Sequence, residues 1–180
     1  MKKVFGVFLI SFIALAAQVE TNETSSNSAV LSDSTNAATL PSISLKDMDG
    51  NTINVKDMAD SGKITIFSFW ATWCGPCKKE LKNINELLED WESDYNVKLV
   101  AVCTDDSRNA PKVKPYVNGQ GWEFPVIMDP NQEFQRAMNA PNIPFTVVVD
   151  GQGKVRYTHL GYVEGDEYEL EKKIKAIAGK

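Results

Sequence analysis

The sequence predicts an α/β domain with a central mixed β-sheet that is flanked by helices. Three apolar, β-rich runs, at residues 63–69, 97–103 and 145–150, have the length of buried strands. Between the first two runs, from residue 74 to about residue 94, apolar residues recur at steps of three and four, as in an amphipathic helix. A helix that connects two buried strands favours a parallel pair with a right-handed crossover. Strands alternating with helices in this way define the α/β class.

The first 17 residues have the pattern of a secretory signal peptide. Lys2 and Lys3 precede an uncharged run from Val4 to Ala17, which ends in small residues. This run is short for a membrane span, which needs about 20 apolar residues. A buried N-terminal helix is one alternative, and an uncleaved segment that tethers the protein to the membrane is another. We expect an exported protein on the periplasmic or cell-envelope side of the membrane.

Residues 18–40 are rich in Ser, Thr, Asn and Ala and contain no aromatic residue. Such a segment cannot bury enough apolar surface to offset its ordering entropy, so it predicts a disordered linker. The folded domain is then expected over residues 41–180. The net charge of the chain is −5, which disfavours a surface that binds nucleic acid.

A β-hairpin that turns at Asp49-Gly50 is expected at the start of the domain, because short strand-like segments flank this favourable turn pair. The buried strand at 63–69 follows it. The helix at 74–94 begins soon after that strand. Pro76 lies in its first turn, where the missing N–H costs nothing.

After the strand at 97–103, residues 105–121 form a polar insertion in which one short helix is expected at 112–117. A brief strand within residues 122–128 and a short helix at 131–139 are predicted next.

The C-terminal part contains a second predicted hairpin, in which residues 151–153 turn the strand at 145–150 into a strand at 154–160. An amphipathic helix at 166–178 closes the domain. The complete order is therefore a hairpin in front of alternating strands and helices, which predicts a mixed sheet.

Cys74 and Cys77 lie where the strand at 63–69 gives way to the following helix. A thiol reacts as its thiolate, which the free N–H groups and the positive dipole end of a helix N-terminus stabilise. We expect Cys74 to be accessible there and Cys77 to lie one turn inside the helix. This spacing places an attacking thiol beside a resolving thiol, as disulfide exchange requires.

Two structural alternatives compete with redox chemistry for the cysteine pair. A zinc site needs two more ligands, and only Cys103 and His159 are available, so we expect no metal. A purely structural disulfide would close too small a loop to constrain much unfolded-chain entropy. Cys103 itself is expected to be a buried, inert thiol, with a regulatory thiol as the alternative.

The stretch from Phe69 to Cys77, FWATWCGPC, resembles the active site of thioredoxin-fold proteins. The following Lys-Lys-Glu, the front hairpin and the insertion resemble the exported TlpA/ResA-like subgroup, and the similarity extends over about residues 41–178. The resemblance implies a thioredoxin-like fold with an insertion after the second core strand. It also implies a redox-active disulfide, no cofactor, and contacts to the substrate from Trp73, Gly75 and Pro76.

Further roles are implied by the same resemblance. Pro144 matches a cis proline that faces the cysteines, and the backbone of Ile143 would pair with the client chain. Glu80 matches an acidic residue that helps to move protons, although a solvated charge is the alternative. Gly161 matches a glycine near the site or simply ends a strand. Ser68 stands where thioredoxin has a buried aspartate, so proton handling would fall to Glu80.

We therefore expect an extracytoplasmic thiol–disulfide oxidoreductase that acts as a monomer. The Gly-Pro pair between the cysteines resembles that of reducing thioredoxins, which favours reduction of disulfides in client proteins. A membrane thiol carrier would supply the electrons, and cytochrome c maturation is one context for such proteins. The alternatives are a peroxiredoxin-like thiol peroxidase and a non-catalytic metal or haem chaperone.

Overall fold

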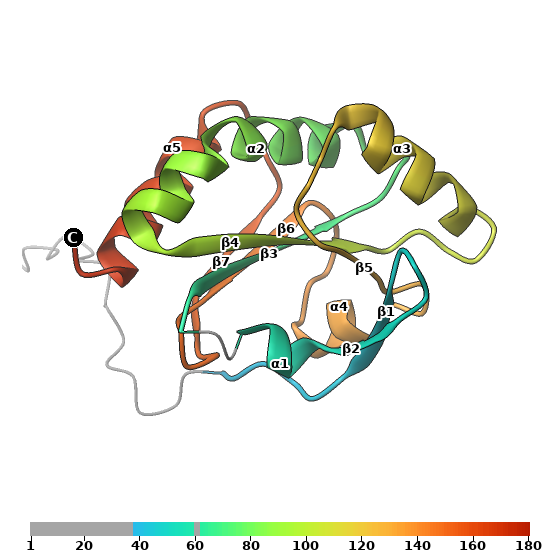
Figure 1. Cartoon of the computed structure of the whole chain (residues 1–180), viewed down its shortest axis with the longest axis horizontal. Coiled ribbons are helices and arrows are strands. Elements are labelled where there is room, and N and C mark those ends of the chain that lie inside the picture. The colour runs from blue at the N-terminus through green and yellow to red at the C-terminus, as the bar shows by residue number, and fades with distance from the viewer. Residues whose placement is uncertain (1–37, 60–61) are drawn as a thin grey trace, which may run out of the picture. The chain divides into compact units, whose positions relative to one another are not determined.

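The computed structural model describes residues 38–59 and 62–180 (Figure 1). The predicted signal peptide, and the predicted linker up to residue 37, lie outside these residues. Within the described ranges, none of the helices combines the length and the apolar character needed to cross a bilayer.

The sheet of the described part has seven strands in the order β2-β1-β5-β4-β3-β6-β7. Their bounds are β1 Ser44–Asp47, β2 Thr52–Asn54, β3 Ile64–Trp70, β4 Val97–Cys103, β5 Val126–Met128, β6 Phe145–Val149 and β7 Val155–Leu160. The central pairs β3–β4 and β4–β5 are parallel, and the other pairs are antiparallel. The predicted mixed sheet, the parallel central pair and both hairpins are therefore confirmed.

Helices cover both faces of this sheet (Figure 1). One face carries α2, α3 and α5, and the other carries α1 and α4. Their bounds are α1 Val55–Ala59, α2 Gly75–Tyr95, α3 Val113–Gln120, α4 Glu133–Ala137 and α5 Asp166–Ile177, with a short 3₁₀ turn η1 at Ala110–Lys112. The helix α1 was not predicted from the sequence, because a helix of five residues is too short to show a helical period.

The strand β3 is the centre of the domain, since all seven of its residues are buried. Its side chains alternate between two apolar cores, as those of a strand covered on both faces must. Ile66 and Trp70 pack in the core under α2 and α5, while Phe67 and Phe69 pack with Phe134 of α4 in the other core. The carboxyl end of this rigid strand leads directly to the cysteine pair.

Two boundaries differ from the prediction. Leu40 is buried in the core beside α1 and donates its N–H to the Gly153 carbonyl at 3.1 Å, and the Val155 N–H donates to the Ala38 carbonyl at 2.8 Å. The expected domain start at residue 41 is therefore too late, because an apolar residue at the end of the predicted linker completes a core. The helix expected at 131–139 is also shorter, since Gln132 at its start has a left-handed backbone with φ of 55°.

Candidate active site

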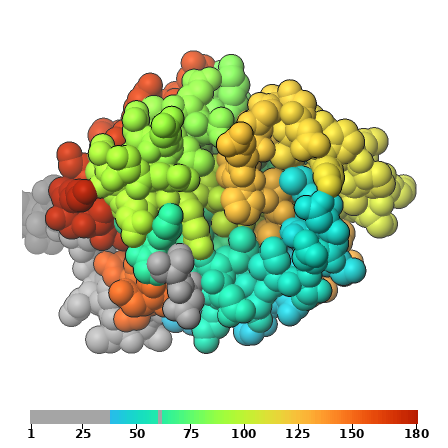
Figure 2. Space-filling model, in the orientation of Figure 1, coloured from blue at the N-terminus to red at the C-terminus, as the bar shows by residue number. Residues whose placement is uncertain are grey.

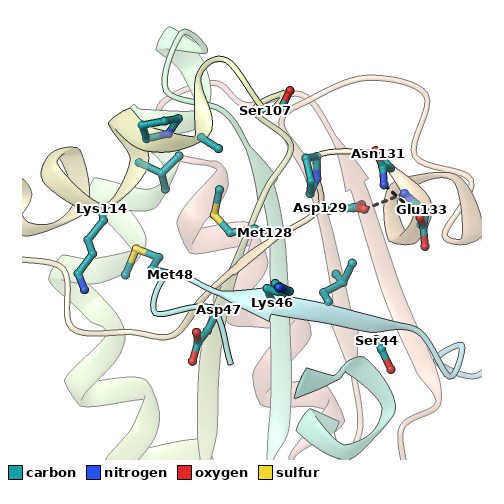
Figure 3. Close-up of a pocket in the computed structure, with 16 residues that line it drawn as sticks. Ser44, Lys46, Asp47, Met48, Ser107, Lys114, Met128, Asp129, Asn131 and Glu133 are labelled. Atoms are coloured by element: carbon teal, nitrogen blue, oxygen red, sulfur yellow. Dashed lines mark hydrogen bonds between the residues drawn. The ribbon is translucent and has the colours of Figure 1, made fainter. Parts of the chain in front are cut away.

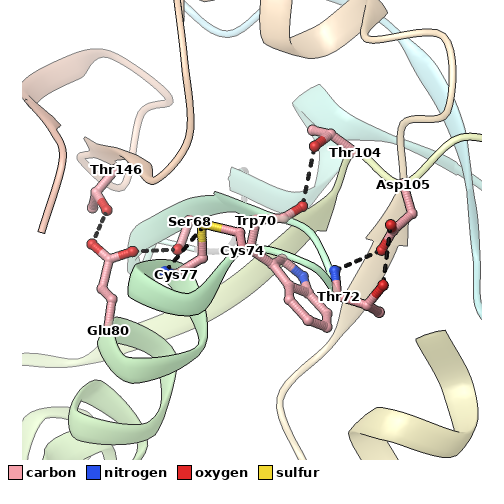
Figure 4. The surroundings of a disulfide bond; sticks show 9 residues. All are labelled: Ser68, Trp70, Thr72, Cys74, Cys77, Glu80, Thr104, Asp105 and Thr146. Carbon is pink, nitrogen blue, oxygen red and sulfur yellow. Dashed lines mark hydrogen bonds between the residues drawn. A yellow bond between two sulfur atoms is a disulfide. The ribbon is translucent and has the colours of Figure 1, made fainter. Parts of the chain in front are cut away.

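The two cysteines form a disulfide at the start of α2, with their Cα atoms 5.4 Å apart (Figure 4). Cys74 is the N-cap residue of the helix, with an extended backbone, and its Sγ accepts the N–H of Cys77 at 3.3 Å. Pro76 lies in the first helical turn, as the sequence predicts. The same N–H, together with the helix dipole, would stabilise a Cys74 thiolate after reduction.

The disulfide is less exposed than expected. Cys74 is 5% exposed and Cys77 is fully buried, so the expectation of an accessible Cys74 is wrong for the oxidised form. The reason is that the Cys74 sulfur is turned towards Cys77 and packs in the core that contains Trp70 and Leu81. The exposed residues next to the disulfide are Trp73, Gly75 and Pro76, which we call the rim of the site. The Trp73 residue is 67% exposed.

Pro144 and Ile143 lie at the same edge of the sheet as the cysteines. The Ile143–Pro144 peptide bond is cis, as the resemblance implies. It directly precedes β6, and β6 begins opposite the end of β3, where Phe145 pairs with Phe69. The Gly161 N–H donates to the Pro144 carbonyl at 2.8 Å, which brings the end of β7 to the same place.

Glu80 is buried under α2, where its carboxylate accepts two hydroxyl hydrogen bonds (Figure 4). Thr146 donates to Oε1 at 2.7 Å and Ser68 donates to Oε2 at 3.0 Å. Burial raises the pKa of Glu80 to about 7, although both hydrogen bonds act in the opposite direction. The alternative of a solvated charge is therefore wrong, because Glu80 lies on the face of α2 that packs against the sheet.

The position of Glu80 fits a group that exchanges protons with Cys77. The two residues are three positions apart on α2 and both are buried, so they occupy one face of the helix, one turn apart. A carboxyl group with a pKa near 7 can both take and return a proton at neutral pH. Ser68 helps to orient this carboxylate by donating a hydrogen bond to it.

Asp105 holds the loop in front of the cysteines and was not singled out from the sequence. Its buried carboxylate accepts the backbone N–H of Thr72 at 2.7 Å and the Thr72 hydroxyl at 3.1 Å. The thiol of Cys103 donates to the same carboxylate at 3.3 Å. Its place just after β4, beside the end of β3, was the signal that could have identified it, since functional groups gather at the carboxyl ends of parallel strands.

The structure confirms that Cys103 is buried. Burial raises the pKa of its thiol, so little reactive thiolate forms at neutral pH. The Cys103 thiol donates a hydrogen bond to Asp105, the carboxylate that holds the loop at Thr72. This structural contact agrees with the expected inert thiol.

We predict that Asp105→Ala destabilises the protein by about 2–4 kcal/mol, because it leaves the Thr72 N–H and two further donors without their acceptor. Chemical denaturation of the oxidised protein measures this loss. Exchange should slow as well, since the loop before Cys74 loses its anchor. Asp106→Ala, at a half-buried neighbouring carboxylate that contacts only its own turn, is the matched control and should cost less.

A second feature of the described residues is a pocket that lies away from the cysteines. It has a volume of about 520 Å³ and lies between the front hairpin and the insertion, which meet on the face shown in Figure 2. The side chains of Met48 and Met128 lie in it (Figure 3). Nearby, an ion pair between Lys114 and Asp49 joins the hairpin to α3. None of the predicted site residues lines this pocket, so the pocket and the cysteine site are separate features.

Within residues 38–59 and 62–180, no three or more His, Cys, Asp or Glu side chains are grouped so that they could hold a metal ion. The groups that do converge at the end of β3 are two bonded sulfur atoms, a cis proline and a buried carboxyl group. A mixed sheet with helices on both faces and this constellation at the edge defines a thioredoxin-like disulfide-exchange protein.

Comparison with known proteins gives the family. The model of the AhpC/TSA family matches residues 36–158. The thiol-disulfide oxidoreductase ResA of Bacillus thuringiensis (strain Al Hakam) is 33% identical over 137 residues, which are 76% of this chain and 75% of the relative. The chain therefore belongs to the AhpC/TSA family of thioredoxin-like proteins, and it is an enzyme of the thiol–disulfide oxidoreductase class.

Solved structures agree with the fold. A thioredoxin-like protein from Porphyromonas gingivalis superposes with a TM-score of 0.70 at 46% identity, over 78% of this chain and 92% of that one. A thiol:disulfide interchange protein from Chlorobium tepidum TLS has a TM-score of 0.65 at 27% identity, over 79% of this chain and 97% of that one. The predicted thioredoxin-like fold and the resemblance to ResA-like proteins are confirmed.

Proposed function

We propose that the protein reduces disulfides of client proteins outside the cytoplasm, using Cys74 and Cys77 as the reacting dithiol. The observation that supports this most directly is the disulfide at the N-terminus of α2, with the buried Glu80 carboxyl group one helical turn further on. The pair supplies the two electrons, and the carboxyl group handles a proton where water has little access.

The first step forms a mixed disulfide. The Cys74 thiolate attacks one sulfur of the client disulfide, so a bond forms between Cys74 and the client while the S–S bond of the client breaks. The released client thiolate takes a proton from solvent. Cys74 is suited to this attack because it is the N-cap residue and lies next to the exposed rim.

The second step resolves the mixed disulfide. Cys77 gives its proton to the Glu80 carboxylate, and the Cys77 thiolate attacks the Cys74 sulfur. The bond between the two cysteines forms, the bond between Cys74 and the client breaks, and the second client thiolate leaves and is protonated. Two electrons have then passed from the protein to the client, and Glu80 is left with one proton.

The client is proposed to bind across the rim of the site. Trp73, Gly75 and Pro76 are exposed beside the disulfide and can contact the chain around the client cysteine. Ile143 is half-buried just before the cis bond, where its backbone groups would pair with an extended client segment. A monomer suffices for this arrangement, because all of these residues belong to one chain.

The direction and the location rest on sequence features. The Gly-Pro pair between the cysteines favours a reductant, and the pattern of the first 17 residues favours export with cleavage or with retention as a membrane tether. A reductant outside the cytoplasm needs an electron donor, for which we propose a membrane thiol carrier. The similar protein from Bacillus thuringiensis is named thiol-disulfide oxidoreductase ResA. For this chain we propose reduction of apocytochrome c as one use of the same activity.

Equilibration of the full-length protein with thiol–disulfide buffers tests the reducing direction. We expect a reduction potential nearer to that of thioredoxin, about −270 mV, than to that of a strong oxidant, about −120 mV. The reduced protein should also reduce a protein disulfide in solution. A potential near −120 mV would reverse the proposed direction, and rapid consumption of peroxide without disulfide reduction would favour a thiol peroxidase instead.

A further inference from the structure

A row of three polar side chains crosses the sheet beneath α2. Ser68 of β3 pairs with Thr146 of β6, and Thr146 pairs with His159 of β7. Directly paired residues on neighbouring strands point to the same face of a sheet. The row therefore extends from the strand that precedes the cysteines to the last strand of the sheet.

The Glu80 carboxylate lies over the inner part of this row, where Ser68 and Thr146 donate hydrogen bonds to its two oxygen atoms. A small cavity connects this carboxylate to the outer end of the row, because Glu80, Thr146 and His159 all line it. Its volume is about 10 Å³. That is close to the minimum that one water molecule needs.

The outer end of the row reaches solvent at His159, whose side chain is 36% exposed. The imidazole Nε2 lies 3.2 Å from Oδ2 of Asp166, at the start of α5. The same oxygen of Asp166 accepts the Val163 N–H at 2.8 Å, which fixes the carboxylate. The remaining titratable groups that line the cavity are Tyr157, which stacks on the imidazole, and the hydrogen-bonded pair Tyr162 and Glu167.

Glu80 needs such an outlet if the proposed function is correct. In the resolving step it receives a proton from Cys77, and it must lose that proton before the next cycle. The newly formed disulfide covers the side towards the cysteines, where Cys77 is fully buried and Cys74 is 5% exposed. The cavity towards His159 leads from the carboxyl group in another direction, towards solvent.

We propose, on the basis of the function proposed above, that His159 is the proton-relay residue through which Glu80 exchanges its proton with solvent, and that Asp166 positions the imidazole. Protonated Glu80 gives its proton to an imidazole nitrogen, across the cavity or through one water molecule in it. The imidazolium then releases a proton to solvent. Both residues return to their starting states, and no electrons move. His159 acts through Glu80 and touches neither client nor sulfur.

A pH-jump experiment on the full-length, reduced protein separates this relay from a structural role. The protein is held at pH 5.5, where Glu80 is protonated, and is then mixed with a small aromatic disulfide at pH 8 while release of the second thiol is followed. We expect wild type to resolve after a short lag, and we expect the lag of His159→Gln to be about tenfold longer. Added imidazole should shorten the lag in the variant only.

The same variant supplies its own control. His159→Gln that is held at pH 8 before mixing should resolve as fast as wild type, because Glu80 has already lost its proton. Thr158→Ala, at the exposed neighbouring position, should match wild type in both protocols, and Asp166→Asn should show a shorter lag than His159→Gln. Equal slowing of His159→Gln from both starting pH values, or no response to imidazole, would overturn the relay.

The outcome also separates this inference from the function on which it depends. If wild type fails to exchange in every protocol, the proposed function is wrong. If wild type exchanges, Glu80→Gln resolves slowly from both starting pH values and His159→Gln shows no lag, the function stands and the relay is wrong.

Discussion

Replacing Cys74 with serine is expected to lower the rate of client-disulfide reduction by more than about a thousandfold. A serine hydroxyl stays protonated at neutral pH, whereas the N-cap position stabilises a thiolate at this site. The loss should appear in the rate and not in the fold, because the sulfur of Cys74 is replaced by an atom that can still accept the N–H of residue 77.

A stopped-flow assay with excess client disulfide measures this change. Thr158→Ala, an exposed substitution on β7, controls for handling of the variants and should keep the wild-type rate. Exchange by Cys74→Ser within tenfold of wild type would mean that another group starts the reaction, since the attack proposed here depends on that single thiolate.

Glu80→Gln is expected to slow the resolving step by about 10²-fold at neutral pH, because the amide cannot take the Cys77 proton. The pH dependence should change with it. In wild type the carboxylate that accepts the proton forms as the pH rises through about 7, so the resolving rate should rise over that range. Glu80→Gln should lack this rise, and an unchanged profile would remove Glu80 from the mechanism.

Glu80→Gln should also change how the free energy of unfolding depends on pH. The pKa of Glu80 is raised from 4.5 to about 7 in the folded protein, so the native state binds more protons than the unfolded state between these pH values. The free energy of unfolding therefore falls as the pH rises from about 4.5 through 7, by about 3 kcal/mol in total. This contribution is fully present at low pH and lost above pH 7.

Urea denaturation of the oxidised protein at pH 5 and pH 8 measures this effect. Relative to wild type, Glu80→Gln should gain stability between the two pH values, because it carries no charge that must be buried at pH 8. A difference between the variants that stays constant from pH 5 to pH 8 would contradict a buried carboxyl group with a raised pKa.

Sequence patterns predicted the elements that have a clear period or a strong turn. The helix α2 begins and ends within one residue of its expected bounds, because its buried residues recur over many turns. The strand β4 matches its expected bounds, because it is a continuous apolar run between polar residues. The hairpin at Asp49-Gly50 was predicted from its turn pair. The five-residue helices α1 and α4 are too short for periodicity to define them.

The polar part of the site was harder to predict, since it depends on contacts between distant segments. The resemblance suggested Glu80 as a proton acceptor. Its raised pKa comes from burial, and its carboxylate is held by the Thr146 hydroxyl, 66 positions away in the sequence. Neither property can be read from the local sequence. In the sequence, Asp105 was only the first residue of the predicted insertion, and His159 was considered only as a possible zinc ligand. Only the register of the sheet places them next to the groups that they contact.

The central claim is that Cys74 attacks a client disulfide and Cys77 resolves the intermediate. The most direct test is expression of full-length Cys77→Ser in the native cell, followed by non-reducing isolation and mass spectrometry. We expect a trapped mixed disulfide between Cys74 and a client cysteine, which is released by reductant and is absent when Cys74 is also replaced by serine. If Cys77→Ser forms no such adduct, or if the adduct forms through Cys103, the exchange mechanism proposed here is wrong.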